Sequence, residues 1–176
     1  MKNFKFEKGF TLVEILTVIG VLGVLSIATF TVLNPFEQTK KAYDVSRKAD
    51  LVQIQKALEA YYGDKGRYPR TTGSAYYCLQ DFSAPFTYYC GGSNWSPYMN
   101  LVPKDPNSSH RYVYYAPSDG QSYYIYANLE RGSRDPQTCG GNGSACSSLS
   151  TNNIPSSACG SGVLCNYGVS SPNVTP

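Results

Sequence analysis

The chain has 176 residues, with 15 lysines and arginines against 12 aspartates and glutamates, so its formal net charge is only +3. This length suits one soluble domain of ordinary size plus an appended segment, and it argues against a second full domain. Such a small charge lacks the basic footprint that phosphate contacts require, so we expect no nucleic-acid partner except through a local patch. A single histidine and the absence of G-x-S-x-G, P-loop and H-E-x-x-H motifs argue against an enzyme.

The N-terminal segment combines a basic start with a long apolar run. Lys2, Lys5 and Lys8 precede residues 10–33, which contain a single charged side chain, that of Glu14. At about 1.5 Å per residue, a helix over this run is roughly 36 Å long and exceeds a hydrocarbon core of about 30 Å. The positive-inside rule keeps the lysines in the cytoplasm and sends the rest of the chain outward. We therefore expect a membrane precursor whose main part is extracytoplasmic.

Glu14 is the unexpected residue of this run. A carboxylate in the centre of an apolar span costs about 2.5 to 3.5 kcal/mol, less near an end, and is a functional candidate by default. A secretory signal cleaved near Ala28 and a plain membrane anchor are two alternatives. The apolar run continues past Ala28 to Leu33 and exceeds the length of about 7 to 15 residues that is usual for a signal core. Neither alternative gives Glu14 a purpose.

The start of the apolar run carries a resemblance to a known family. It reads Lys8-Gly9-Phe10-Thr11-Leu12-Val13-Glu14. This stretch resembles the type III signal of the type IV pilin superfamily, which has a basic leader, a glycine, a phenylalanine and a glutamate fifth in the mature chain. The resemblance implies that a prepilin peptidase cleaves between Gly9 and Phe10 and methylates the new amine of Phe10. It also implies that Glu14 pairs with the N-terminal amine of a neighbouring subunit during assembly.

Elementary electrostatics supports such a pairing. An ammonium at Phe10 and a carboxylate at Glu14 are both costly in lipid or in a packed filament core unless each finds a partner. Staggered mispairing leaves buried charges unpaired, so the pair would set the register of the polymer. The alternative is that Glu14 only caps its own helix, which contributes about 0.3 to 1 kcal/mol.

A second helical segment is predicted after Asn34-Pro35, where the proline removes a hydrogen-bond donor and favours a kink. Within residues 36–63, one apolar stripe has helical spacing and consists of Leu51, Ile54, Leu58 and Tyr61. We expect this stripe to pack on a globular domain. The charged residues are expected mostly off the stripe, namely Lys40, Lys41, Asp44, Arg47, Lys48 and Lys56. Residues 47–69 also resemble major pseudopilins of type II secretion, in which such a helix ends before a G-x-Y-P turn.

The region after this helix predicts a loop and a small antiparallel sheet. Gly63 and the turn that follows it are expected to end the helix. Residues 71–97 are rich in Tyr, Ser, Gly and Pro and are interpreted as the loop that links helix and sheet in pilins. Residues 111–115 and 122–129 are aromatic and β-branched runs, which predict a hairpin with its turn at Asp119-Gly120.

Beyond Glu130 the composition shifts to Gly, Ser, Asn and Cys, and little apolar area remains to pack, so we expect disulfides to hold this tail. The expected fold class is α+β, a pilin-like roll. In it a long N-terminal helix, membrane-spanning and then amphipathic, packs on a small antiparallel sheet with a disulfide-rich C-terminal tail. The expected divisions are a leader at 1–9, a membrane and polymerisation helix at 10–35, an amphipathic helix at 36–63, an αβ-loop and sheet at 64–130, and the tail at 131–176.

All six cysteines lie in the polar part of the chain, at Cys78, Cys90, Cys139, Cys146, Cys159 and Cys165. An even number on the extracytoplasmic side predicts structural disulfides formed in an oxidising compartment. Zinc ligation is the competing interpretation, but no C-x-x-C pair occurs and His110 is far from every cysteine in sequence. The spacings invite pairing between sequence neighbours, yet six cysteines allow many connectivities. Only Cys78 with Cys90 is predicted as a pair.

No cofactor is predicted. Some major pseudopilins bind calcium in a loop, and Asp105, Asp119 and Asp135 lie in loops near the predicted strands, but the chain has no EF-hand pattern. The 16 tyrosines favour strands and interfaces over a dedicated aromatic site. Glycosylation sequons, which Asn-rich and Ser-rich chains also produce by chance, occur at Asn94, Asn107, Asn142 and Asn173.

We therefore expect the structural subunit of a type IV pilus or pilus-like filament. Its expected partners are copies of itself, a prepilin peptidase, an inner-membrane assembly platform and, before assembly, the membrane. Its expected location is the cytoplasmic membrane for the precursor, then an extracytoplasmic filament or the cell surface. The first alternative is a pseudopilin of a type II secretion system, and the second is a monomeric membrane-tethered binding domain. The sequence leaves open whether the subunit is major or minor and whether it serves adhesion, motility or DNA uptake.

Overall fold

The structure, a computed structural model of the chain, describes residues 9–72, 75–81 and 87–176. The predicted leader lies outside the described residues except for Gly9. The chain divides into two compact units, Met1–Thr39 and Lys40–Pro176. The second unit contains the described strands and is referred to as the head.

Two helices follow each other at the N-terminus, α1 (Leu12–Leu33) and α2 (Pro35–Lys65). They are separated by Asn34, whose φ of 39° lies in the left-handed region that often ends a helix. Pro35 has no N–H to continue the hydrogen bonding of α1, and its fixed φ suits the first position of a new helix. The predicted interruption at these two residues is thus confirmed.

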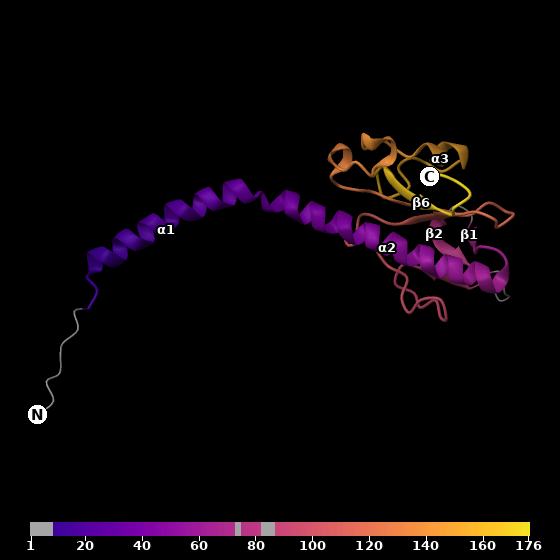
Figure 1. The fold of residues 1–176 in the computed structure, drawn as a ribbon, viewed down its shortest axis with the longest axis horizontal. Coiled ribbons are helices and arrows are strands. Elements are labelled where there is room, and N and C mark those ends of the chain that lie inside the picture. The colour runs from indigo at the N-terminus through magenta and orange to yellow at the C-terminus, as the bar shows by residue number, and fades with distance from the viewer. Residues whose placement is uncertain (1–8, 73–74, 82–86) are drawn as a thin grey trace, which may run out of the picture. The chain divides into compact units, whose positions relative to one another are not determined.

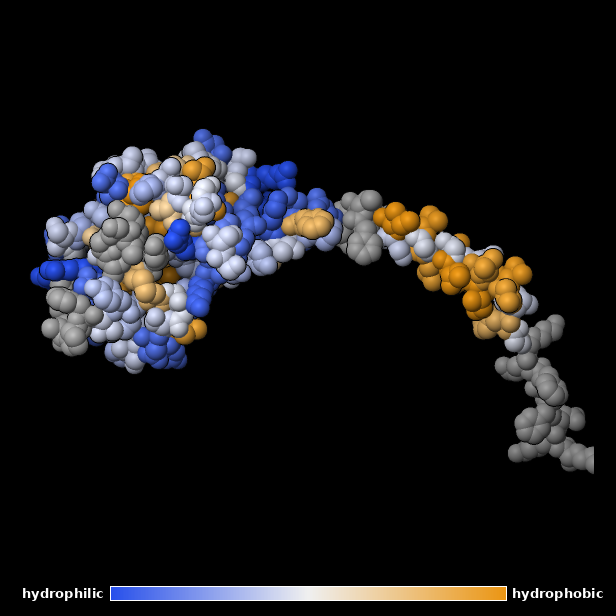
Figure 2. All heavy atoms as spheres, turned by 180° about the vertical axis from the view of Figure 1, so that it is seen from behind, coloured by the Kyte–Doolittle hydropathy of each residue, from blue (hydrophilic) through white to orange (hydrophobic). Residues whose placement is uncertain are grey.

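Hydrophobic side chains are exposed along α1, and Figure 2 shows them in orange on this helix. Within the described residues, no helix combines the length and the hydropathy that crossing a bilayer requires. The membrane span expected for residues 10–33 stays a prediction.

Helix α2 ends at Lys65, beyond its predicted end at Gly63. Gly66 adopts a φ of 70°, and its N–H donates to the carbonyl oxygen of Tyr62 at 2.8 Å, which closes the last turn. Gly63 is exposed and remains helical, because one glycine costs a helix only about 1 kcal/mol relative to alanine.

One face of α2 forms the centre of the head. The predicted stripe of Leu51, Ile54, Leu58 and Tyr61 is buried, and Ala57 is buried with it. These side chains belong to the larger of two hydrophobic clusters, which also includes residues of both sheets. The amphipathic helix packed on a globular domain is therefore confirmed.

The prediction that charged residues lie off this face is wrong for Asp44 and Arg47. Their exposed fractions are only 1% and 0%. They lie about two turns and one turn before Leu51, so the buried face of α2 begins with a charged pair and continues with apolar residues. The pair is buried because the rest of the head supplies partners for both charges, as described below.

The first sheet has the order β1-β2-β3, with β1 (Arg70–Thr72), β2 (Ala75–Gln80) and β3 (Tyr88–Cys90). Both pairs of strands are antiparallel, and Cys78 lies opposite Cys90. The interpretation of residues 71–97 as a loop is therefore wrong for these three segments. The disulfide between the facing cysteines joins strands that are too short to be stable by themselves.

The second sheet has the order β4-β5-β6, with β4 (Val113–Tyr115), β5 (Tyr124–Ala127) and β6 (Tyr167–Ser170), all antiparallel. Strands β4 and β5 form the predicted hairpin, and Gly120 in its connection has a φ of 65°. Strand β6 comes from the tail, for which the sequence predicts no strand. Figure 1 shows β6 in yellow, the colour of the C-terminal end of the chain.

The tail is an ordered layer of the head. It contains the 3₁₀ helices η1 (Gly132–Arg134) and η2 (Cys139–Gly141) and the helix α3 (Ser147–Thr151). Strands β4 and β5 explain how it packs, because successive side chains of a strand point to opposite faces. Tyr114 and Ile125 belong to the cluster on α2. The second cluster lies on the other face and consists of Val113, Tyr126, Cys146, Leu149, Ile154, Cys159 and Cys165. The expectation that little apolar area remains for the tail is wrong for this reason.

The cysteines form three disulfides, Cys78 with Cys90, Cys139 with Cys146 and Cys159 with Cys165. The one pair that the sequence predicts is confirmed. The other two pairs also join sequence neighbours, and both lie in or beside the second cluster, where burial keeps the sulfurs away from water. No thiol remains for zinc ligation.

We predict that the native protein has no alkylatable thiol. Iodoacetamide under denaturing, non-reducing conditions should add no mass, whereas treatment after reduction should modify all six cysteines. Peptide mapping without reduction should recover the three neighbouring pairs. Labelling of two or more cysteines before reduction, or a cross-linked peptide that joins Cys78 to the tail, would contradict this disulfide set.

Candidate functional site

The first turn of α1 contains a reciprocal cap. Thr11 is the N-cap residue, and its Oγ1 accepts a hydrogen bond from the backbone N–H of Glu14 at 3.3 Å. In return, the Glu14 Oε2 accepts from the backbone N–H and from the hydroxyl of Thr11, each at 2.8 Å. This is a capping box, which satisfies two backbone donors that a helix N-terminus leaves unpaired. Glu14 therefore does cap its own helix, as the alternative interpretation proposed.

Capping uses only one of the two carboxylate oxygens of Glu14. Both hydrogen bonds from Thr11 are accepted by Oε2, and within the described residues no hydrogen bond reaches Oε1. Phe10, the predicted first residue of the mature chain, is 86% exposed. Gly9 before it has no other atom near the position of an added Cβ. The predicted cleavage point thus lies in an exposed segment without regular secondary structure, directly before a capped helix.

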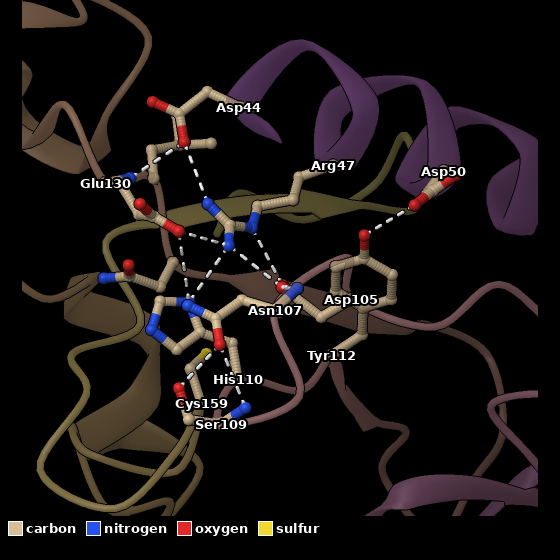
Figure 3. Close-up of polar contacts among 12 residues, drawn as sticks. Asp44, Arg47, Asp50, Asp105, Asn107, Ser109, His110, Tyr112, Glu130 and Cys159 are labelled. Atoms are coloured by element: carbon tan, nitrogen blue, oxygen red, sulfur yellow. Dashed lines mark hydrogen bonds and ion pairs between the residues drawn. The ribbon is translucent and has the colours of Figure 1, made fainter. Parts of the chain in front are cut away.

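The head contains a second constellation, which is centred on the guanidinium of Arg47 (Figure 3). Its Nε and Nη2 donate to the two carboxylate oxygens of Asp105 at 2.8 and 2.9 Å. Nη1 donates to Asp44 at 3.0 Å, and Nη2 also donates to Glu130 at 2.8 Å. Nη2 lies 3.1 Å from Nδ1 of His110, and since a guanidinium can only donate, Nδ1 is the acceptor.

These contacts connect α2 to two distant segments of the head. Asp105 precedes β4, and Glu130 follows β5. Asp44 strengthens the second connection, because its carboxylate accepts the backbone N–H groups of Glu130 and Arg131 at 2.8 and 3.0 Å. Burial disfavours the charged guanidinium, but the hydrogen bonds and charges of Asp105 and Glu130 outweigh burial and raise the pKa of Arg47 above its ordinary value. The five residues Asp44, Arg47, Asp105, His110 and Glu130 are called the Arg47 cluster below.

Two further polar contacts join α2 to the rest of the head. The Tyr112 hydroxyl donates to Asp50 at 2.6 Å, and Lys48 Nζ donates to Asp135 at 2.6 Å. Burial raises the pKa of Asp50 above its ordinary value. The charge of Asp105 raises this pKa further, and the hydrogen bond from Tyr112 lowers it in part. Burial also acts to raise the pKa of Asp135, but the Lys48 ammonium and other donors outweigh it and lower this pKa.

The three aspartates named as calcium candidates do not meet at one place. Asp105 binds Arg47, and Asp135 binds Lys48. Asp119 accepts the backbone N–H of Gln121 in a local turn at 3.1 Å. Among the described residues, no group of three or more His, Cys, Asp or Glu side chains is placed to hold a metal ion. Asp105 and Asp135 are thus buried members of separate ion pairs, and Asp119 stabilises a local turn.

Sequence reasoning missed the Arg47 cluster, although one signal for it exists. Asp44 and Arg47 continue the alternating spacing of three and four residues that the apolar stripe follows from Leu51 onward. A charged pair in register with a buried stripe indicates buried charges. Its partners Asp105 and Glu130 have no such signal, because they lie in loops far from α2 in sequence.

The N-terminal signal and the long helix packed on antiparallel strands define the class of the protein, a subunit of the type IV pilin superfamily. Comparison with known families narrows this class. A model described as "Type II secretion system (T2SS), protein G" matches residues 34–144, and one described as "Prokaryotic N-terminal methylation motif" matches residues 4–30. The chain belongs to the family of type II secretion system protein G. The family match ends before α3 and β6, so both elements lie outside it.

Relatives that carry the name type II secretion system core protein G agree with this membership. One from Vibrio cholerae serotype O1 is 33% identical over 121 residues, which cover 68% of this chain and 77% of the relative. One from Escherichia coli K12 is 30% identical over 117 residues, which cover 66% and 77% of the two chains. One from Pseudomonas aeruginosa is 29% identical over 123 residues, which cover 69% and 82%. No solved structure matches the chain. These matches favour the secretion alternative over the pilus interpretation.

We predict that Arg47→Met destabilises the head by about 3 to 5 kcal/mol, because it leaves buried carboxylates without their cation. Arg47→Lys should be intermediate, since an ammonium keeps the charge but lacks the planar fork that binds both oxygens of Asp105. The measurement is urea unfolding of the full chain in detergent, followed by the fluorescence of Trp95, the single and buried tryptophan.

The matched control is Lys65→Met at the exposed end of the same helix, which should change the free energy of unfolding by less than about 0.5 kcal/mol. If Arg47→Met unfolds with the same midpoint as the control, the Arg47 cluster does not stabilise the head.

Proposed function

We propose that this chain is a pseudopilin of a type II secretion system, a structural subunit that polymerises through α1 into a filament of the cell envelope. The observation that carries the proposal is the joint match to the methylation motif and to the protein G family, on one chain with a capped apolar helix. A prepilin peptidase would cleave the precursor between Gly9 and Phe10 and methylate the new amine. The family is one of structural subunits, and the proposal assigns no catalytic role to any residue.

The geometry of the first turn supports a role for Glu14 in assembly. Cleavage would create an ammonium at Phe10, next to the cap residue Thr11. The Thr11 hydrogen bonds hold the Glu14 side chain against the end of its helix, so the carboxylate is positioned before a partner arrives. Its Oε1 is left to accept the ammonium of a neighbouring subunit. In an apolar environment each of the two charges is costly alone, so only the register that pairs them is favourable.

The exposed face of α1 supplies the attraction between subunits. Large apolar side chains are exposed all along the described part of this helix, from Leu12 to Ile27. Such a surface is stable only in lipid or against other helices. The charge pair would then select the register, and the apolar contacts would contribute most of the binding free energy.

We predict that the mature protein begins with an N-methylated Phe10, and that Gly9→Val leaves the precursor uncut. Glycine at this position leaves the peptide bond open to a protease, whereas a β-branched side chain crowds it. The mass of the N-terminal peptide from native protein shows where the chain was cleaved and whether Phe10 is methylated. A membrane-tethered monomer would keep Met1 or lose residues near Ala28, and either result would contradict the proposal.

A second prediction separates capping from charge pairing. Glu14→Gln keeps an oxygen that can complete the capping box but removes the charge, so we expect normal insertion and cleavage with few or no filaments. Thr11→Val removes the cap hydroxyl but keeps the carboxylate, so filament number should stay near that of the wild type. Filaments are counted by electron microscopy in cells that carry one variant as their sole subunit at matched membrane levels.

The converse outcome would assign Glu14 to capping alone. Wild-type filament number with Glu14→Gln, together with filament loss in Thr11→Val, would show that the hydrogen bonds of the first turn matter and the charge does not. Secretion of a reporter substrate, measured in the same strains, tests whether the filament serves export.

A further inference from the structure

A cavity of about 420 Å³ opens within the head beside the Arg47 cluster. It lies between α2, the first sheet and the hairpin of the second sheet, and its volume is within the range of small-molecule sites. Asp105, His110 and Tyr112, which Figure 3 labels, contribute to its wall. Nothing in the family match or in the processing of α1 gives this cavity a purpose.

The floor of the cavity is apolar. It is formed by buried side chains from several elements, namely Ile54, Leu79, Val102, Tyr114 and Ile125. Water gains too few hydrogen bonds on such a surface to occupy it well. An apolar occupant is therefore the fitting one.

The charged side chains around the cavity indicate which polar group the occupant should carry. Three charged side chains line it, those of Lys104, Asp105 and Arg111. Both oxygens of Asp105 already accept from Arg47, and Oδ1 also accepts the backbone N–H of Asn107 at 2.8 Å. The single acid of the wall is thus neutralised from within the fold. The exposed Lys104 brings a positive charge to the mouth of the cavity.

The backbone makes room for Lys104 at this mouth. A Cβ added at Gly91 would lie 3.1 Å from the Lys104 Cγ, and one added at Gly92 would overlap the Lys104 Cε. The Gly92 N–H donates to the carbonyl oxygen of Val102 at 2.6 Å, which fixes the two glycines against the segment that carries the lysine. The absence of a side chain at Gly92 gives the end of the Lys104 side chain room to lie across this turn, and Lys104 lines the cavity together with Gly91.

We propose that the head binds a small amphipathic carboxylate in this cavity, with the apolar body of the ligand on the floor and its carboxylate at Lys104. A monovalent anion matches the positive mouth, and an aryl or alkyl body matches the floor. The site is independent of assembly through α1. Its wall shares Asp105 and His110 with the Arg47 cluster, so an occupant also packs against the contacts that hold α2 in place.

The test uses the full mature chain in detergent and three probes of one shape: 4-phenylbutyrate, 4-phenylbutanol and 4-phenylbutylamine. Isothermal titration, with the detergent blank subtracted, should show saturable one-site binding with the acid tightest and the amine weakest. Lys104→Gln should weaken binding of the acid at least about tenfold, which corresponds to about 1.4 kcal/mol, and leave the alcohol unchanged, because it removes the charged partner of the carboxylate. Lys65→Gln, an exposed lysine away from the cavity, should change neither.

Leu79→Trp, which fills the floor, should abolish binding of both the acid and the alcohol. If this variant fails to fold, the comparison of Lys104→Gln with Lys65→Gln still decides, since both lysines are exposed. The proposal is overturned by the absence of saturable binding above the blank, by equal affinity for acid and alcohol, or by a Lys104→Gln protein that binds the acid like the wild type.

Discussion

The head depends on one buried cation. Arg47 is fully buried, and its guanidinium is held by carboxylates from three parts of the chain: Asp44 on its own helix, Asp105 before β4 and Glu130 after β5. Removing such a charge from water is costly, so the arrangement is stable only when every partner is in place. The cluster therefore specifies how α2 lies against the second sheet. Apolar packing along Leu51 to Tyr61 supplies most of the stabilisation, but it is less specific about registration along the helix.

The second sheet packs between α2 and the C-terminal layer. Its central strand β5 has one face on α2 and the other on the tail, so the two clusters share a single layer of backbone. Two short disulfide loops add to the stability of this layer by limiting the freedom of the unfolded tail. The family match covers α2, the first sheet and the hairpin of β4 and β5, and it ends at residue 144, inside the tail. Strand β6 lies outside the family match, but it pairs with β5, which lies inside the match.

The N-terminal helix α1 differs from the head because its apolar side chains are exposed. Its side chains have no partner within the described part of the chain, apart from the cap at Thr11 and Glu14 and hydroxyl contacts to the helix backbone. A helix of this kind is completed by lipid or by other subunits. The capping box shows how one carboxylate can serve its own helix through Oε2 and still offer Oε1 to a neighbour. Intrachain and interchain roles of Glu14 are compatible because a carboxylate has two oxygens.

The sequence by itself determined the features that depend on local pattern: the interrupted long helix, the buried stripe from Leu51 to Tyr61, the hairpin of β4 and β5, the pairing of Cys78 with Cys90, and the signal at Gly9 and Phe10. The structural features follow from the spacing of neighbouring residues, whereas the signal at Gly9 and Phe10 rests on resemblance to a known family. Only the tertiary structure decided the features that join distant segments. Strand β6 needs a partner some forty residues earlier; Arg47 needs Asp105 and Glu130, which are 58 and 83 residues away. The cavity beside them exists only once all of these segments have come together. A loop acid gives no local sign of the cation it will meet, because that contact is fixed by the packing of the whole head.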